Sequence, residues 1–384
     1  MKCFVALIAT CVALDANVGS VAEEPTSGPV FNLDAYLEEP IAQGQTPGLW
    51  AAIIDGTGVR AIGAAGVRRQ GASRAVTADD LLHIGSNTKA MTATMLAMLV
   101  EDGTFANGWE TTILEVFPEL REDIHEKYHP VTLSQLVRME GGMVHMPNDQ
   151  WAYARTPNIV KRRYKIIQES LGSAPRELVG WYAYSNLSYV VAGAMAERVT
   201  GESWETLMEE RLFAPLGITT AGFGPPGSHR GMDQPWGHQR SDRGGWKSNK
   251  FDNDPMLGPA GTIHISIGDW ARFVALWFRE REPEILGRAA LDELTDPGSS
   301  AGDYAAGWFA WYRGWARGRA LFHDGSNLSW RSSLWIAPER GLAYLSVANA
   351  TEDIYGGDDT FWMLDSIIGR LIQDTPAILA EGYD

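Results

Sequence analysis

Cysteine is nearly absent from this sequence of 384 residues: only Cys3 and Cys11 occur, and both lie near the N-terminus. The same end has Lys2, an apolar run and small residues at 20–22, which together predict a secretory signal peptide at residues 1–22. An uncleaved apolar anchor is the alternative interpretation. If the segment is removed, the mature chain has no cysteine, which excludes disulfides, a thiolate nucleophile and a zinc site with thiolate ligands.

Positive charge is also scarce. The sequence has 32 Lys and Arg against 48 Asp and Glu, a formal net charge of −16, and such a field repels nucleic acid and anionic membrane surfaces. No stretch after residue 22 approaches the roughly 18 apolar residues that a membrane helix needs. We therefore predict a periplasmic or secreted protein without stable membrane insertion, whose partner is a small molecule or short peptide and not a nucleic acid.

Strand patterns occur near both ends of the chain, with helical patterns between them. Residues 48–67 form two β-rich runs separated by the turn Asp55-Gly56, and residues 332–349 form two more. This order predicts an α+β fold of the α/β sandwich type, with an antiparallel sheet built from both chain ends, flanking helices and an inserted, mostly helical domain. The predicted units are a sheet domain at 23–85 and 255–384, and a helical domain at 86–254 with a long loop at 222–259.

The stretch HEKYH matches the zinc-binding pattern H-E-x-x-H, in which His125 and His129 would be ligands and Glu126 the base. That pattern needs a continuing helix and a third protein ligand. Pro130 follows at once and disfavours helical geometry at the preceding residue, and no persuasive third ligand appears downstream. We interpret the stretch as a polar surface segment and predict no metal and no cofactor. A zinc metalloprotease is kept as an alternative.

Ser86-Asn87-Thr88-Lys89 is an S-x-x-K motif at the start of an apolar helix pattern that extends to about residue 103. Three residues make almost one helical turn, so the serine hydroxyl and the lysine amine can project from the same face. Serine needs an adjacent base to be nucleophilic, and lysine can be that base only if burial depresses its pKa. The motif is common by chance, and a serine-capped core helix with an incidental lysine is the alternative.

Two further motifs follow. Tyr184-Ser185-Asn186 stands at the start of a helix pattern, and His323-Asp324-Gly325-Ser326 stands on what should be an edge strand beside the site. With S-x-x-K, the chain resembles the serine β-lactamase and penicillin-binding protein superfamily, in its class C-like, esterase and D-peptidase branch. The motifs of that superfamily are S-x-x-K, Y-x-N and K/H-x-G, in this order, and the resemblance extends from about residue 33 to 372.

The resemblance implies a role for each motif residue. Ser86 would be the acylated nucleophile, and Lys89 and Tyr184 would share the general-base and general-acid work; which of the two takes the first proton stays open. The residues implied in substrate binding are Asn186, His323, Gly325 and Ser326. Asn186 would bind Lys89 or the substrate amide, His323 and Gly325 would line the acyl group, and the backbone N–H groups of Ser86 and Ser326 would form the oxyanion hole.

This chain departs from the superfamily in several places. His323 replaces the lysine that offers a permanent cation to a substrate carboxylate, which disfavours efficient β-lactam hydrolysis. Asp324 stands where a small or hydroxyl residue is usual, and its charge would repel an anion or bind an amine. MEGGM at 139–143 replaces a histidine-containing loop. Five tryptophans between 308 and 335 would either wall an apolar cleft or pack in the core.

We predict an exported serine hydrolase that cleaves a small ester, amide or peptide substrate through an acyl-enzyme at Ser86. The first alternative is a β-lactamase or D-alanyl-D-alanine carboxypeptidase. The second is a non-catalytic penicillin-recognition or sensor module, which would keep the fold and lose turnover.

Overall fold

The computed structural model describes residues 30–146, 156–228, 231–241, 244–278, 285–298, 302–352 and 359–380. The predicted signal peptide at residues 1–22 lies outside these ranges. Among the helices of the described ranges, none is both long and apolar enough to cross a membrane.

The largest sheet in the described residues has seven strands in the order β1-β3-β2-β12-β11-β10-β9. Their bounds are β1 Phe31–Asn32, β2 Gly48–Asp55, β3 Gly58–Gly66, β9 Phe309–Arg313, β10 Gly318–Ser326, β11 Arg331–Ala337 and β12 Leu342–Ala348. β2 pairs antiparallel with β12, which joins the two chain ends in the middle of the sheet. The predicted sheet is therefore confirmed, with one addition: the short β1 pairs parallel with β3.

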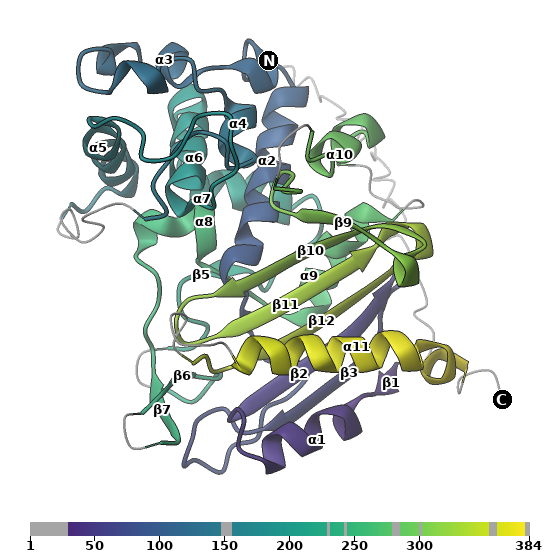
Figure 1. Ribbon diagram of the computed structural model, residues 1–384. Helices are drawn as coiled ribbons and strands as arrows, with labels where there is room; N and C mark the ends of the chain where they lie inside the picture. Colours follow the sequence, from purple (N-terminus) through teal and green to yellow (C-terminus); the bar gives the residue numbers. More distant parts are fainter. Residues whose placement is uncertain are drawn as a thin grey trace, which may run out of the picture.

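Both faces of the sheet are covered, and its inner strand β2 is apolar on both sides. Leu49, Ala51 and Ile53 pack against the side that carries α1 (Asp34–Ala42) and α11 (Asp359–Ala380). The alternate residues of β2 belong to the larger core, which continues into the helical lobe. Figure 1 shows α11 and α1 on the near face of the sheet and the helical lobe above it. A strand that is buried on both faces reads as a continuous apolar run, as β2 does.

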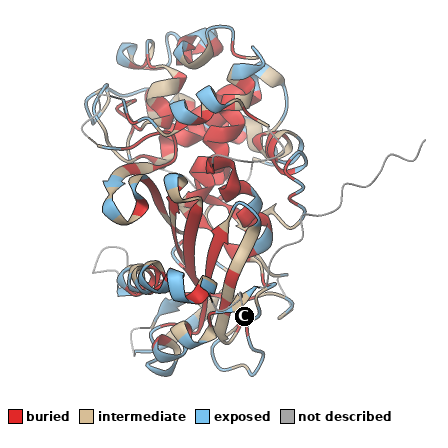
Figure 2. Ribbon diagram, turned by 90° about the vertical axis from the view of Figure 1, so that its right-hand side faces the viewer, coloured by how far each residue is buried: buried red, intermediate tan, exposed pale blue. Residues whose placement is uncertain are grey.

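The helical lobe surrounds α2, which is buried nearly all round. The helices between the two halves of the sheet are α2 Thr88–Glu101, α3 Ile113–Val116, α4 Leu133–Val137, α5 Ile159–Leu171, α6 Asn186–Thr200, α7 Trp204–Leu207, a π-helical turn Met208–Phe213, α8 Gly258–Gly261, α9 Ile267–Val274 and α10 Arg288–Leu294. Figure 2 shows buried residues through the inside of both the lobe and the sheet. α2 begins beside the sheet and runs into the lobe, so its first turn lies at their junction (Figure 1).

The loop predicted at 222–259 is not a continuous surface loop, which corrects the sequence interpretation. It contains β5, β6 and β7 and ends in a buried 3₁₀ turn, with bounds β5 Gly222–Phe223, β6 Gly237–Arg240, β7 Trp246–Asn249 and turn Pro255–Leu257. β5 pairs with β8 (Ile263–Ile265), which pairs with β4 (Leu82–His83). β6 and β7 pair with each other as a hairpin. The polar composition hid both pairings, because these strands are short and lack apolar alternation. The division into domains at 86–254 stays a prediction.

The HEKYH stretch does not form the helix that zinc binding by this pattern requires. Only Glu126–Tyr128 is helical, as a single 3₁₀ turn, and His125 precedes it in extended conformation with φ −63° and ψ 138°. Its Nδ1 accepts the backbone N–H of Lys127 at 3.2 Å. Elsewhere in the described ranges, no group of three His, Cys, Asp or Glu side chains is placed to hold a metal ion.

Candidate active site

Ser86 lies in a 3₁₀ turn, η1 (Gly85–Asn87), that runs directly into α2. Gly85 has φ +51°, and a Cβ atom there would lie 2.3 Å from the backbone nitrogen of Ser326. Glycine is required at this position both for the backbone conformation and for the close approach of β10. Ser86 itself is partly exposed, whereas its neighbours in the turn are buried. The serine is therefore presented to solvent from a rigid turn.

Lys89 reaches the serine from the first turn of α2. Its Nζ lies 2.8 Å from Ser86 Oγ, 2.7 Å from Asn186 Oδ1 and 2.7 Å from the carbonyl oxygen of Ala260. The side chain has no exposed surface. Burial lowers the pKa of Lys89 well below its usual value, and the negative charge of Asp324 opposes that shift only in part. A neutral amine at this distance can accept the proton of the serine hydroxyl.

Tyr184 and Asn186 are brought to the lysine by the start of α6. Ser185 caps that helix by accepting the backbone N–H of Ser188 at 3.1 Å, and this places the residues on either side of the cap beside Lys89. Lys89 Nζ lies 5.0 Å from the centre of the Tyr184 ring. Burial raises the pKa of Tyr184 above its usual value, opposed by a hydrogen bond with Ser86. Tyr184 therefore keeps its proton at neutral pH.

The third motif lies on β10, where the strand has one open edge. β9 pairs with β10 only from Gly318 to Phe322, so the following residues, His323 to Ser326, pair with β11 alone. The expectation of an edge strand is wrong for the sheet as a whole, because β9 is the outer strand. A Cβ atom at Gly325 would lie 2.0 Å from the carbonyl oxygen of Ile84. The close packing of β10 on η1 thus places the backbone of Ser326 beside Ser86.

His323 is buried and does not present its ring to solvent. Its Nδ1 lies 2.5 Å from the carbonyl oxygen of Asp324, and its Nε2 lies 3.1 Å from the hydroxyl of Tyr304. Burial lowers the pKa of His323 to about 4, although the Asp324 carboxylate opposes the shift. The ring is therefore neutral at pH 7. Asp324 pairs with Arg331 at 2.7 Å, so its charge is compensated within the protein.

The structure thus brings the seven predicted site residues together where η1, α2, α6 and β10 meet. A sequence profile of the family described as Beta-lactamase matches residues 33–363. The chain belongs to the β-lactamase family. This agrees with the superfamily resemblance and with the fold.

The relatives described next are distant from this chain in sequence. An unguisins hydrolase of Aspergillus campestris is 25% identical over 82% of this chain, and the match spans 60% of that relative's length. Penicillin-binding protein 4 of Amycolatopsis lactamdurans is 24% identical over 74% of this chain and 76% of its own. Among solved structures, the D-amino acid amidase of Ochrobactrum anthropi is similar with a TM-score of 0.67, 20% identity and coverage of 91% and 96%. At that identity the structural likeness shows the fold alone.

Several residues that shape the site have no signal in the sequence. Tyr304 is one of them, because nothing in the sequence distinguishes a single aromatic residue of an irregular segment from other aromatic residues. The loop that contains MEGGM is another: Met139, at φ +62°, accepts the backbone N–H of Ala183 at 2.9 Å through its carbonyl oxygen. The carbonyl oxygen of His145 accepts the backbone N–H of Asn186, also at 2.9 Å. This loop therefore holds the second motif in place through backbone hydrogen bonds.

The five tryptophans do not gather around Ser86. Trp330 stacks on Trp50 with ring centres 5.9 Å apart, and Trp308 meets Trp277 edge to face at 5.5 Å. The other three, Trp311, Trp315 and Trp335, pack on one another and on Phe322 and Tyr344. Of the two interpretations left open, core and sheet packing is the one that the structure shows.

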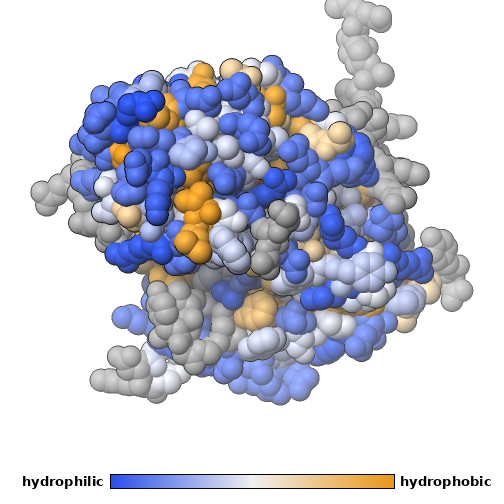
Figure 3. Space-filling model, turned by 45° about the horizontal axis from the view of Figure 1, so that its top comes forward, coloured by the Kyte–Doolittle hydropathy of each residue, from blue (hydrophilic) through white to orange (hydrophobic). Residues whose placement is uncertain are grey.

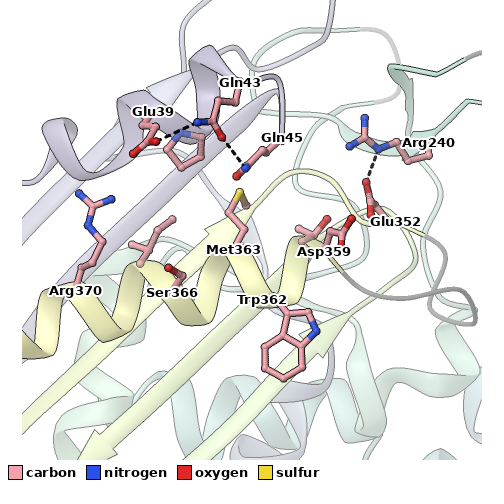
Figure 4. Close-up of a pocket in the computed structure, with 13 residues that line it drawn as sticks. Glu39, Gln43, Gln45, Arg240, Glu352, Asp359, Trp362, Met363, Ser366 and Arg370 are labelled. Atoms are coloured by element: carbon pink, nitrogen blue, oxygen red, sulfur yellow. Dashed lines mark hydrogen bonds and ion pairs between the residues drawn. The ribbon is translucent and has the colours of Figure 1, made fainter.

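A distinct cavity of about 480 Å³ lies between α1 and α11, and none of the seven predicted site residues lines it. Figure 4 shows its polar rim, where Gln43 bridges Glu39 and Gln45 and where Arg240 pairs with Glu352. Figure 3 shows a face of the molecule on which hydrophilic residues predominate and hydrophobic residues form small separate groups. This cavity is therefore separate from the buried lysine and its serine.

Proposed function

We propose that the protein is an exported serine hydrolase that cleaves a small ester or amide substrate, including short peptides, through an acyl-enzyme at Ser86. One observation carries the proposal: a completely buried Lys89 holds its amine 2.8 Å from a partly exposed serine hydroxyl. Burying a charged amine costs free energy, which favours the neutral form. Groups whose pKa is shifted in this way concentrate at reactive sites.

In the proposed acylation, neutral Lys89 accepts the proton of Ser86 while Oγ attacks the substrate carbonyl carbon. The backbone N–H groups of Ser86 and Ser326 stabilise the negative oxygen that forms. The bond to the leaving group then breaks, and the leaving alcohol or amine takes a proton through Tyr184, which regains it from Lys89. Water attacks the resulting ester in the second half-reaction, releases the carboxylic acid and restores the hydroxyl of Ser86.

The charges near the third motif support substrates without a carboxylate beside the scissile bond. His323 is neutral at pH 7, and Asp324 and Arg331 compensate each other. A penicillin or a D-alanyl-D-alanine peptide presents a carboxylate in that region, and a permanent cation is the usual means of binding it. We therefore favour esters and amides over the alternative of a β-lactamase or a D-alanyl-D-alanine carboxypeptidase.

Intact-mass spectrometry tests the acyl-enzyme. The protein is incubated in turn with a fluorophosphonate, an aryl ester and a penicillin, with Ser86→Ala as the control. We expect a Ser86 adduct with the first two reagents and none in the variant. Absence of any adduct in the wild-type protein overturns the proposal and favours the non-catalytic sensor module. Activity that is lost with chelator or with Glu126→Gln would instead support a metalloprotease.

A matched substrate pair tests the class of substrate. The same amide is prepared with a free carboxylate next to the scissile bond and with that carboxylate as a methyl ester. We expect a higher kcat/KM for the capped form, and a His323→Lys variant should reduce the difference by supplying a cation. A clear preference for the free carboxylate would favour the carboxypeptidase alternative. Export is tested by N-terminal sequencing of secreted protein, which is expected to begin at Glu23.

A further inference from the structure

A carboxylate outside the three motifs connects the two backbone segments of the proposed oxyanion hole. One segment is the turn at Gly85 and Ser86, and the other is the end of β10 at Ser326 and Asn327. Asp252 lies between β7 and the turn that begins at Pro255, far from both segments in sequence. Its Oδ1 accepts a hydrogen bond from Asn327 Nδ2 at 2.9 Å and lies 2.8 Å from His83 Nε2.

His83 carries the connection to the nucleophile turn. It is completely buried, and its Nδ1 accepts the backbone N–H of Gly85 at 3.1 Å. Because Nδ1 is an acceptor, the ring carries its proton on Nε2, the atom that faces Asp252. The Asp252 oxygen lies to one side of the ring N–H direction, so this contact is an electrostatic attraction and not a linear hydrogen bond.

Asn327 carries the connection to β10. Its Oδ1 accepts the backbone N–H groups of Ser329 at 3.1 Å and of Trp330 at 2.9 Å, which closes the turn after the strand. Leu328 in that turn has φ +69°, a left-handed conformation that a branched side chain rarely adopts. The hydrogen bond to Asp252 holds the Asn327 amide in the orientation that this turn needs.

We infer that Asp252, with His83 and Asn327, is a positioning residue that sets the distance between the two oxyanion-hole N–H groups. The inference rests on the proposed function, because it concerns the transition state of that reaction. Donors in an oxyanion hole act only if they are aimed at the oxygen before it becomes charged, so small shifts between their segments lower transition-state binding more than substrate binding. A residue that contributed to stability alone would not lower transition-state binding more than substrate binding.

Steady-state kinetics with an aryl ester tests this role in the full chain. We expect Asp252→Ala and Asn327→Ala each to lower kcat by roughly 10- to 100-fold with little change in KM, somewhat less than the loss of a donor itself. The double variant should lose much less than the product of the two single losses, because both break one connection. Asp252→Asn keeps an acceptor of the same shape for Asn327 and should retain more kcat than Asp252→Ala.

The controls separate failure of this inference from failure of the proposed function. Lys250→Ala alters the same segment without touching the connection and should keep the wild-type kcat. The concentration of active sites is measured by titration with fluorophosphonate, so that kcat refers only to correctly folded protein. A wild-type protein that forms no adduct overturns the proposed function. A wild-type protein that reacts, together with an Asp252→Ala variant of lower Tm and unchanged kcat per titrated site, overturns the positioning role alone.

Discussion

At the scale of single residues, the most unusual group is the amine of Lys89. In water the amine would be charged, but here it is removed from solvent and surrounded by oxygen atoms of Ser86, Asn186 and Ala260. Burial penalises the charged form, so the pKa of Lys89 falls and the neutral form exists at lower pH than for an exposed lysine. The proposed reaction thus depends on the burial of Lys89, which the S-x-x-K motif does not specify.

Replacing Lys89 by arginine tests whether the neutral amine is needed. A guanidinium stays protonated at all usable pH values, so Lys89→Arg keeps a positive charge and loses the base. We expect kcat/KM for an aryl ester to fall by about 10²- to 10⁴-fold, the usual worth of a general base. Lys127→Arg, at an exposed lysine, is the matched control and should behave as the wild type. A Lys89→Arg enzyme within tenfold of the wild type would rule out Lys89 as the base.

At the scale of elements, the site depends on how closely β10 approaches η1. Glycines at 85 and 325 permit that approach, because a side chain on either would collide with backbone atoms of the other element. Backbone atoms cannot move aside as the end of a flexible side chain can. Ser332 adds a further tie, since its Oγ donates to the carbonyl oxygen of Ile84 at 2.9 Å and accepts from Asn87 Nδ2 at 2.9 Å.

Gly325→Ala should separate the two elements. The added Cβ would lie 2.0 Å from the carbonyl oxygen of Ile84 and 2.9 Å from the backbone nitrogen of Ser86. We expect a loss of at least about 100-fold in kcat/KM, comparable to the loss of an oxyanion donor, and a lower Tm. Gly369→Ala is the control: this glycine lies within α11 with no atom close to its Cβ position, and alanine there should raise stability by up to about 1 kcal/mol. Equal activity of both variants would contradict the close-approach argument.

At the scale of the whole molecule, two buried histidines make stability depend on pH. Burial lowers the pKa of both His323 and His238 to about 4, from the usual value near 6.5. The unfolded chain therefore binds more protons than the native protein between these pH values. Each histidine therefore contributes about 3 kcal/mol to the free energy of unfolding above pH 6.5, and this contribution is lost as the pH drops towards 4.

Urea unfolding at pH 7 and at pH 4.5 measures this dependence. His323→Asn and His238→Asn should each reduce the difference in unfolding free energy between the two pH values, even if both variants are less stable at pH 7. His125→Asn is the control, because asparagine can also accept the N–H of Lys127 and cap the same turn. An unchanged pH difference in both buried-site variants would show that the pKa of these rings is not lowered in the native protein.

Most of the architecture could be predicted from the sequence, and so could the positions of Ser86, Lys89 and Tyr184, because their signals are local. The turn at Asp55-Gly56 and the run of apolar residues on either side specify a hairpin, and the structure has β2 and β3 there. The three-residue spacing from Ser86 to Lys89 places both on one helical face. The sheet between the two chain ends followed from the order of strand and helix patterns. The 222–259 segment was misjudged because its strands are too short and polar to show a periodicity, and because β5 pairs with β8, which lies outside the segment.

The sequence by itself determined which groups are available for catalysis, since S-x-x-K, Y-x-N and H-x-G occur in order and backbone periodicity places each on its element. Only the tertiary structure decided what those groups can do. Complete burial of Lys89, the neutral state of His323 beside Tyr304 and the contact of Asp252 with His83 all arise from residues that are distant in sequence. Desolvation and charge pairing depend on distance in space, and a linear pattern does not record that distance.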